Sequence, residues 1–161
     1  MASRRKARIL AFQALYCWES NRVLPANPNG RSFQVPVEEL ISFAWLEENK
    51  LKNLDEGMSV FAKALIAGAV ENIKEIDLLI QEHLDNWDIS RLNRVDLAIL
   101  RMSVYTLMYQ TDIPPSIVID EAIGICREFG ADDSYKFVNG VLDSIRKALQ
   151  ERQKIGKQGK T

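Results

Sequence analysis

The first twenty residues carry side chains whose types and spacing suit contact with a nucleic acid. Four basic side chains, which can neutralise phosphates, open the segment: Arg4, Arg5, Lys6 and Arg8. Phe12 and Tyr16 follow along the same face of a predicted helix, where an aromatic ring can stack on a base, and Gln13 offers both a donor and an acceptor. Phe12 and Tyr16 can equally form a second core face, and the pattern leaves both interpretations open.

The net charge of −1 conceals basic ends on an acidic body. Residues 1–22 hold five Lys or Arg and one Glu, and residues 146–161 hold six and one. The segment between them holds ten basic and twenty acidic residues. This division favours an anionic polymer at the ends and a basic partner for the body, although basic ends can also serve solubility alone.

Motifs for catalysis or metal binding are missing from the sequence. It contains no GxxxxGK[ST] loop, no GxGxxG, no HExxH and no CxxC. Adjacent carboxylates such as Glu38 and Glu39 point about 100° apart on a helix and do not converge. The single histidine, His83, supports neither a histidine-rich metal site nor a Ser–His–acid arrangement. The sequence therefore predicts a protein that is not an enzyme and holds no metal or cofactor.

Length and composition favour one globular domain. The chain has 161 residues, of which 47% are hydrophobic and 27% charged, so a disordered chain is excluded. No apolar run approaches the roughly 20 residues that span a bilayer, and no signal peptide is recognised. Cys17 and Cys126 lie in apolar stretches, which is typical of reduced, buried thiols. We therefore expect a cytoplasmic protein without membrane contact.

Helical periodicity dominates the chain, and alternating strand patterns are nearly absent. Helices are expected over residues 3–19, 36–48, 55–83, 94–110, 115–129 and 134–153, with a short helical turn near 88–90. Asp55 is a candidate N-cap, and Pro115 opens its helix. The expected fold is all-α, with six or seven helices in two packed three-helix subdomains, about 3–85 and 86–153, and a frayed basic tail over 154–161. One continuous orthogonal bundle is the alternative.

The segment 94–110 is apolar nearly all round and is predicted to be a central, buried helix. Asp96 interrupts it with a carboxylate. Arg94 and Arg101 lie about 140–160° around the helix from Asp96, so an intrahelical pair is not expected. A tertiary salt bridge and a contact with a partner protein both remain as explanations.

Local signals mark the last two helices. Gly130 is a natural C′ residue after 115–129, and Asp132 or Asp133 can cap the helix that follows. Asn139-Gly140 lies inside the apolar stripe of that last helix. There the dipeptide indicates a close helix–helix contact or a backbone approach to a ligand.

Three segments of the chain resemble the NusB family of transcription antitermination factors. They are RRKARILAFQALYCWE (4–19), LNRVDLAILRMSVY (92–105) and PPSIVIDEAIGICREFGADDSYKFVNGVLDSI (114–145). The resemblance implies an all-helical RNA-binding protein that pairs with the ribosomal protein NusE and binds boxA-type single-stranded RNA. It also implies entry into the antitermination complex on RNA polymerase, notably during ribosomal RNA transcription, with no bond made or broken. A NusB-like domain also precedes some ribosomal RNA methyltransferases. This chain lacks a nucleotide-binding βαβ region, so the stand-alone factor is expected.

The resemblance also implies roles for individual residues. The implied RNA contacts are Arg4, Arg5, Lys6, Arg8, Gln13, Tyr16, Asp133, Ser134, Lys136, Phe137 and Asn139. Phe137 can stack on a base or pack in the core, and Asp133 can also be a helix cap that tempers RNA affinity. Asp96 and Arg101 are the implied contacts with the protein partner, through an exposed carboxylate that suits a basic protein. A homodimer that covers the RNA surface is also compatible with the resemblance. A helical protein-interaction module without RNA specificity is the alternative function.

Overall fold

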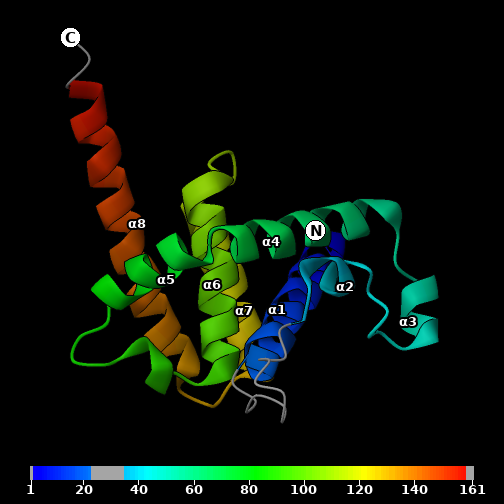
Figure 1. The fold of residues 1–161 in the computed structure, drawn as a ribbon. Coiled ribbons are helices and arrows are strands. Elements are labelled where there is room, and N and C mark those ends of the chain that lie inside the picture. Colours follow the sequence, from blue (N-terminus) through cyan, green and yellow to red (C-terminus); the bar gives the residue numbers. More distant parts are fainter. Residues whose placement is uncertain (1, 23–34, 159–161) are drawn as a thin grey trace.

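Every regular element of the described chain is helical. A computed structural model describes residues 2–22 and 35–158, and within them no strand occurs. The helices of these residues are α1 (Ala2–Arg22), α2 (Val37–Ile41), α3 (Glu48–Lys52), α4 (Glu56–Glu71), α5 (Ile73–Glu82), the 3₁₀ turn η1 (Ile89–Arg91), α6 (Arg94–Tyr109), α7 (Pro115–Phe129) and α8 (Ser134–Gln158) (Figure 1). The predicted all-α class is confirmed. The predicted loop over 21–30 lies almost wholly outside the described residues.

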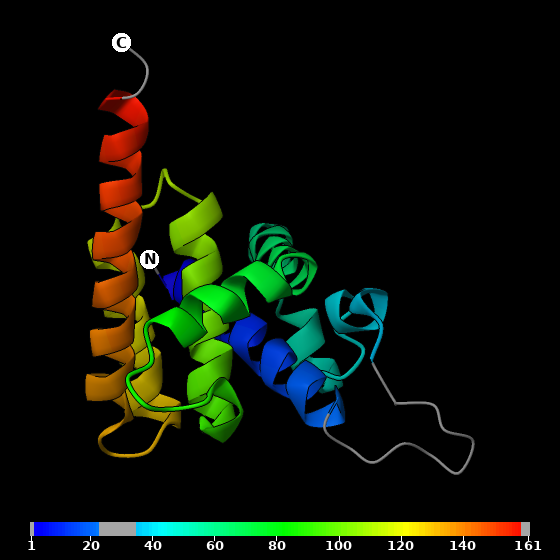
Figure 2. The same ribbon diagram turned by 60° about the vertical axis from the view of Figure 1, so that its left-hand side comes forward.

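Helix α6 forms the centre of the molecule, as its apolar sequence predicts. Residues 97–104 are all buried, because α1, α4, α5, α7 and α8 pack around this helix. α1 also packs on α4, and α7 packs on α8, so that these two pairs flank α6 on opposite sides (Figure 1 and Figure 2). The position of α6 makes it the element through which both halves of the chain share one interior.

A single hydrophobic cluster fills this interior. Its fully buried members include Trp18 of α1, Leu65 of α4 and Ile99 of α6, together with Ile125 of α7 and Leu142 of α8. Burying one such side chain stabilises the folded state by about 1.5–3 kcal/mol. The cluster therefore joins helices from both halves of the chain into one packed unit.

The helix expected over 36–48 is much shorter: α2 ends at Ile41, and α3, which begins only at Glu48, was not expected. Phe43 has a φ of 57° and turns the chain, while its side chain is buried. The backbone carbonyls at the end of α2 are satisfied by side chains: the Ser42 hydroxyl donates to Glu39 O (2.7 Å), and Trp45 Nε1 donates to Leu40 O (3.0 Å). These bonds replace the hydrogen bonds that a longer helix would make.

The helix expected over 55–83 begins as predicted but is interrupted. Asp55 Oδ1 accepts a hydrogen bond from Met58 N at 2.7 Å, which confirms the predicted N-cap of α4. Asn72 Nδ2 donates to Gly68 O at 2.8 Å and ends α4, after which α5 starts at Ile73. This division, together with the unexpected α3, explains why the described residues contain more helices than the six or seven expected.

Helices α7 and α8 meet at a tight corner. Gly130 N donates to Cys126 O at 2.8 Å, and a Cβ at residue 130 would lie only 2.7 Å from the same oxygen. This close approach is what requires a glycine here. The backbone conformation does not, because a φ of −92° is accessible to any residue. α8 continues to Gln158, so residues 154–158 of the expected frayed tail are helical. Among the described helices, none combines the length and hydropathy of a membrane-spanning segment.

Candidate nucleic-acid interface

One face of α1 keeps basic and polar side chains at least partly exposed. We call it the N-terminal basic face, and it consists of Arg5, Lys6, Gln13 and Tyr16, while Arg4 is exposed on the α4 side of the helix. Arg5 Nη2 lies 3.1 Å from Glu128 Oε2 near the end of α7, and both side chains are about half exposed. The Arg4 guanidinium lies 5.2 Å from the centre of the Phe61 ring on α4. These contacts hold the two arginines in place while their charges stay accessible to solvent.

The structure places Arg8 in the interior, where the sequence predicted a surface contact. Arg8 is only 7% exposed, and its guanidinium lies 5.3 Å from the centre of the Phe61 ring. Its Nη1 lies 3.8 Å from Glu121 Oε2. Burial lowers the pKa of Arg8, and the Glu121 carboxylate opposes this shift. Arg8 therefore joins α1 to α4 and α7, and it does not present a free charge.

The two aromatic residues of α1 have different surroundings. The Phe12 ring is buried, with its centre 5.1 Å from that of Phe129 on α7. Tyr16 is 39% exposed. Each residue thus follows a different one of the two interpretations that the sequence left open. Phe12 packs in the core, and Tyr16 keeps a ring available at the surface.

A hollow of about 440 Å³ adjoins the N-terminal basic face. It lies between α1, α3 and the end of α7, and its lining includes Lys6, Gln13, Lys50, Asn53 and Phe129. Lys50 and Asn53 were missed by the sequence analysis. The sequence feature that could have indicated Lys50 is the pair of lysines, Lys50 and Lys52, in the last turn of α3. The hollow extends the basic surface from α1 onto α3.

The first turns of α8 form a second exposed patch. Lys136 is exposed, and its Nζ lies 3.8 Å from Asp133 Oδ1, which is also exposed. Phe137 is half-buried and packs against the core with one part of its ring. Because Arg5 contacts Glu128 and Phe12 contacts Phe129, α1 lies beside the end of α7, just before α8 begins. The two basic patches are therefore neighbours across the α7–α8 corner.

Two residues predicted within this patch are placed elsewhere. Ser134 is buried and donates a hydrogen bond to Asp96 Oδ2 at 3.2 Å. Asn139 is exposed, but it borders a different hollow, beside Asp120 and Arg146 on the α7 side of α8. The structure thus brings Lys136 and Phe137 together and separates them from Asn139.

The expectation of an exposed carboxylate at Asp96 is wrong. Asp96 is 7% exposed, and its Oδ1 is buried without a hydrogen-bond partner among the described residues. Burial raises the pKa of Asp96, and the bond from Ser134 partly offsets this effect. Burial also raises the pKa of the neighbouring Cys126 thiol to about 12, and the charge of Asp96 contributes to that shift. The bond from Ser134 to Asp96 therefore ties the start of α8 to α6.

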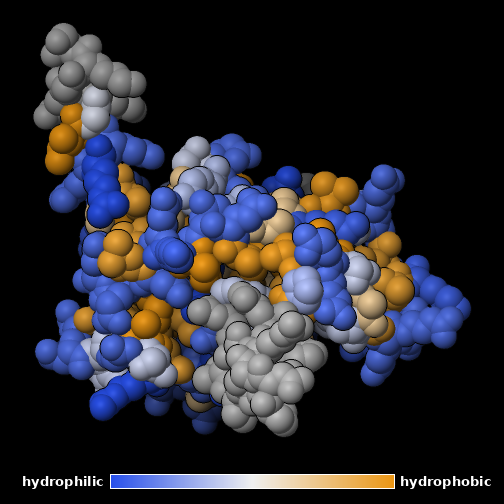
Figure 3. Space-filling view, viewed as in Figure 1, coloured by the Kyte–Doolittle hydropathy of each residue, from blue (hydrophilic) through white to orange (hydrophobic). Residues whose placement is uncertain are grey.

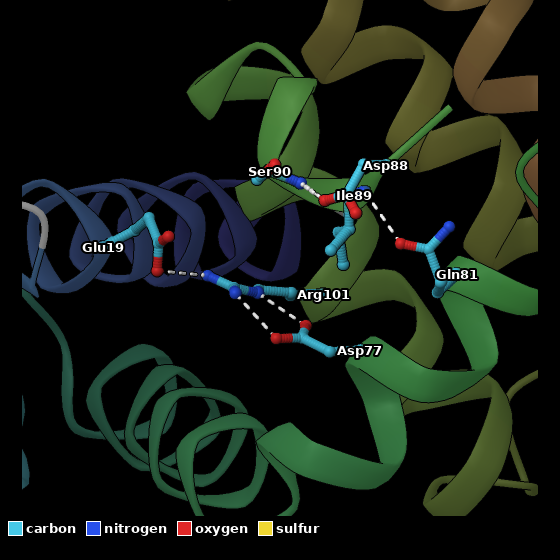
Figure 4. Close-up of polar contacts among 7 residues, drawn as sticks. All are labelled: Glu19, Asp77, Gln81, Asp88, Ile89, Ser90 and Arg101. Atoms are coloured by element: carbon cyan, nitrogen blue, oxygen red, sulfur yellow. Dashed lines mark hydrogen bonds and ion pairs between the residues drawn. The ribbon is translucent and has the colours of Figure 1, made fainter. Parts of the chain in front are cut away.

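Arg101, the other expected partner contact, is also an internal residue. It is 3% exposed, and its Nε and Nη2 donate to the two carboxylate oxygens of Asp77, each at 2.8 Å (Figure 4). Its Nη1 donates to Glu19 Oε2, also at 2.8 Å. Burial pulls the pKa of Arg101 down, but Asp77 and Glu19 outweigh it and leave the pKa raised. This ion-pair network joins α1, α5 and α6.

The described part of the chain holds no group of three or more His, Cys, Asp or Glu residues that could bind a metal ion. Cys17 and Cys126 are free thiols, and Cys126 is buried. What the two surface patches offer is positive charge, amide groups and half-exposed rings. These are the groups with which proteins bind single-stranded nucleic acids.

Comparison with known proteins gives consistent matches over nearly the whole chain. The model of the NusB family matches residues 5–147. The transcription antitermination protein NusB of Treponema denticola is 52% identical over 143 residues, which cover 89% of this chain and 95% of that protein. The NusB protein of Nitratiruptor sp. is 39% identical over 150 residues, covering 93% and 96%.

Solved structures agree with these matches. NusB of T. maritima superposes with a TM-score of 0.72 at 35% identity, covering 89% of this chain and 90% of that one. A crystal structure of antitermination factors NusB and NusE in complex with dsRNA contains a chain with a TM-score of 0.69 and 30% identity. That match covers 92% of this chain and 98% of the other.

Proposed function

This chain belongs to the NusB family, and we propose that it is a transcription antitermination factor that binds boxA-type RNA together with the ribosomal protein NusE. The pair enters the antitermination complex on RNA polymerase, notably during ribosomal RNA transcription. The protein acts in the cytoplasm by binding and tethering, and it is not an enzyme. Residues 1–161 form one RNA-binding domain, with helical halves at about 3–85 and 86–153.

The observation that carries this proposal is a pair of basic-aromatic patches: one on α1, which contacts the end of α7, and one on the first turns of α8, which follow α7. On α1 the RNA contacts are Arg4, Arg5, Lys6, Gln13 and Tyr16. On the segment that opens α8 they are Asp133, Lys136 and Phe137, with Asn139 on a different side of the same helix. Lysine and arginine neutralise phosphates, while Tyr16 and Phe137 provide rings on which unpaired bases stack. Arg8 and Ser134 support these contacts from beneath, because one anchors α1 and the other anchors α8.

The affinity for RNA separates this function from its alternative. The chain is titrated with a boxA-type single strand, a scrambled strand of equal length and a double-stranded RNA, at two salt concentrations. We expect the boxA-type strand to bind more tightly than the scrambled one, and more tightly still when NusE is present. Equal affinity for all three RNAs, with or without NusE, would instead favour a helical protein-interaction module whose basic ends serve solubility.

Sedimentation of the same samples reports the assembly. A homodimer that covers the RNA surface predicts that the chain sediments as a dimer alone and as a smaller complex with NusE and RNA. A monomer that gains mass only on addition of NusE excludes that dimer. The sedimentation result reports the assembly only. The preference for boxA-type RNA is read from the titration, whichever assembly is found.

A further inference from the structure

Gly140 lies inside α8, about two turns from its start, and no packing contact requires a glycine there. A glycine in a helix interior costs about 1 kcal/mol relative to alanine. Such a residue is usually kept where another helix approaches closely. Here a Cβ at residue 140 would meet nothing within 4 Å, so no helix contact requires the glycine. Of the two explanations that the Asn139-Gly140 signal allowed, only the approach of a ligand remains.

Gly140 lines a hollow of about 460 Å³ between α8 and the loop that joins α5 to η1. We call it the Trp87 hollow, and its walls include Glu82, Asp85, Trp87, Lys136 and Phe137. Its volume lies within the range of about 300–1,000 Å³ of ligand pockets. The loop lies beside the first turns of α8 in both ribbon views (Figure 1 and Figure 2), and hydrophobic surface is exposed at this corner of the molecule (Figure 3).

The loop that carries Trp87 is held at several points. Gln81 Nε2 donates to Trp87 O at 2.8 Å. Gln81 Oε1 accepts from Ile89 N, also at 2.8 Å (Figure 4). His83 Nδ1 lies 2.7 Å from Ser144 Oγ, which joins the end of α5 to α8. Trp87 nevertheless has 56% of its surface exposed. A large ring that is exposed on a fixed backbone is a preorganised surface for stacking.

The charges around the hollow indicate which part of an RNA fits it. Lys136 at its rim can meet a phosphate. Two carboxylates also border the hollow: Asp85, and Glu82, whose Oε2 lies 3.8 Å from Arg152 Nη2. They repel phosphate, but they can accept hydrogen bonds from an amino group of a base. Phe137, next to Lys136, continues the hollow into the patch already assigned to RNA.

From this arrangement we propose that the Trp87 hollow binds one unpaired base that carries an exocyclic amino group, stacked on Trp87 and passing close to Gly140. The proposal rests on the proposed function, because the base belongs to the RNA that α1 and α8 bind. It adds two residues, Trp87 and Gly140, to the RNA surface. It also explains why residue 140 is a glycine, because any side chain at this position would occupy the space of the base.

Substitutions at these two residues test the proposal by RNA titration of the full chain. Trp87→Ala should weaken binding of the boxA-type strand roughly 5- to 150-fold, the range that stacking of one base provides. Trp87→Phe should retain most of the affinity. Gly140→Leu should weaken binding as well, whereas its melting temperature should equal or exceed that of the parent because open space receives the side chain. Leu78→Ala, at an exposed apolar residue of α5, is the matched control and should bind normally.

Replacing each base of the strand by uracil in turn identifies the bound base. At one position the replacement should weaken RNA binding by the parent protein. The same replacement should not weaken RNA binding by the Trp87→Ala variant any further. If no position behaves in this way, the assignment of an amino-bearing base is wrong.

The outcomes separate this inference from the function on which it rests. A parent protein that binds all RNAs equally contradicts the function. A parent protein that prefers boxA-type RNA, with Trp87→Ala and Gly140→Leu equal to it, overturns the inference alone. Loss of NusE binding by these variants with unchanged RNA affinity would assign the hollow to a protein and would also overturn it.

Discussion

Basic side chains of this protein divide into two groups by their surroundings. Arg5 and Lys6 remain at the surface of α1, where a phosphate can reach them. Arg8 and Arg101 are buried against rings and carboxylates and hold helices together. A change in the first group should therefore alter RNA binding, and a change in the second should alter stability.

The surface group is tested by the double substitution of Arg5 and Lys6 with alanine. RNA binding should weaken similarly for all sequences, and the slope of log K against log salt should flatten by about one unit, since roughly 0.7 counterions are released per phosphate on single strands. The free energy of unfolding should change by less than about 1 kcal/mol, because exposed ion pairs contribute little. Lys74→Ala, at an exposed lysine of α5, serves as the control. An unchanged salt slope would remove the two residues from the RNA surface.

The buried group is tested at Arg101. Arg101→Ala leaves the carboxylates of Asp77 and Glu19 without their central cation, and breaking a buried network of this kind costs about 3–5 kcal/mol. Arg101→Lys keeps the charge but loses the two-pronged geometry, so it should rescue only part of that loss. Urea unfolding measures both, with Arg94→Ala at an exposed arginine as the reference. A loss below about 1 kcal/mol for Arg101→Ala would contradict the structural role.

Asp96 should make the stability of the protein depend on pH. Because burial raises the pKa of Asp96, the folded state binds its proton more tightly than the unfolded chain does. Its contribution to the free energy of unfolding therefore falls as pH rises from about 4, the unfolded value, to the raised folded pKa, and then stays constant. Cys126, whose pKa is raised to about 12, stays a neutral thiol throughout.

Urea unfolding of Asp96→Asn and the parent chain between pH 4 and pH 8 detects this effect. The variant cannot titrate at residue 96, so its stability relative to the parent should rise with pH over the same interval and then level off. A difference that is flat over the whole range would show that Asp96 has an ordinary pKa in the folded state.

Some helices of this protein begin or end where a side chain hydrogen-bonds to the backbone. Asp55 starts α4, Asn72 ends it, and Ser42 helps to end α2. Such local bonds satisfy groups that the helix itself leaves unpaired. They position α4, which in turn supports α1 through the contacts of Arg4 and Arg8 with Phe61.

The cap of α4 is tested by Asp55→Ala. Losing the bond to Met58 N should lower the free energy of unfolding by about 0.5–2 kcal/mol. Asp55→Asn should remain within a few tenths of a kcal/mol of the parent, because asparagine caps equally well. Thermal or urea unfolding measures both. Equal losses for the two variants would assign the effect to the charge of Asp55 and not to its hydrogen bond.

At the scale of the whole molecule, α6 gives both halves of the chain one interior. The core cluster runs from Trp18 through Ile99 to Leu142 without separating into two. The ion-pair network of Arg101 further ties α1 to α5 and α6. Helices of the two halves should therefore lose their structure together.

This unity predicts a single cooperative unfolding transition. Far-ultraviolet circular dichroism, which follows all helices, and tryptophan fluorescence, to which the buried Trp18 contributes, should give the same midpoint in urea. Two separated midpoints would show that the halves unfold independently and that α6 does not couple them.

The sequence by itself determined the helical class, the buried α6, the N-cap at Asp55 and the basic face at Arg5 and Lys6. Each of these depends on residues within a turn or two, where periodicity and capping report the local backbone directly. The resemblance to NusB proteins then indicated the kind of ligand.

Only the tertiary structure decided which of the polar residues remain available. Arg101 meets Asp77 at a separation of 24 residues, Asp96 meets Ser134 at 38, and Arg5 meets Glu128 at 123. Periodicity assigns a side chain to a face of its own helix, but the packing of distant helices determines whether that face meets solvent, an opposite charge or a ring. For the same reason the Trp87 hollow, which lies between α8 and a loop more than forty residues earlier in the chain, is not predicted by the sequence, although Asn139-Gly140 marked one of its walls.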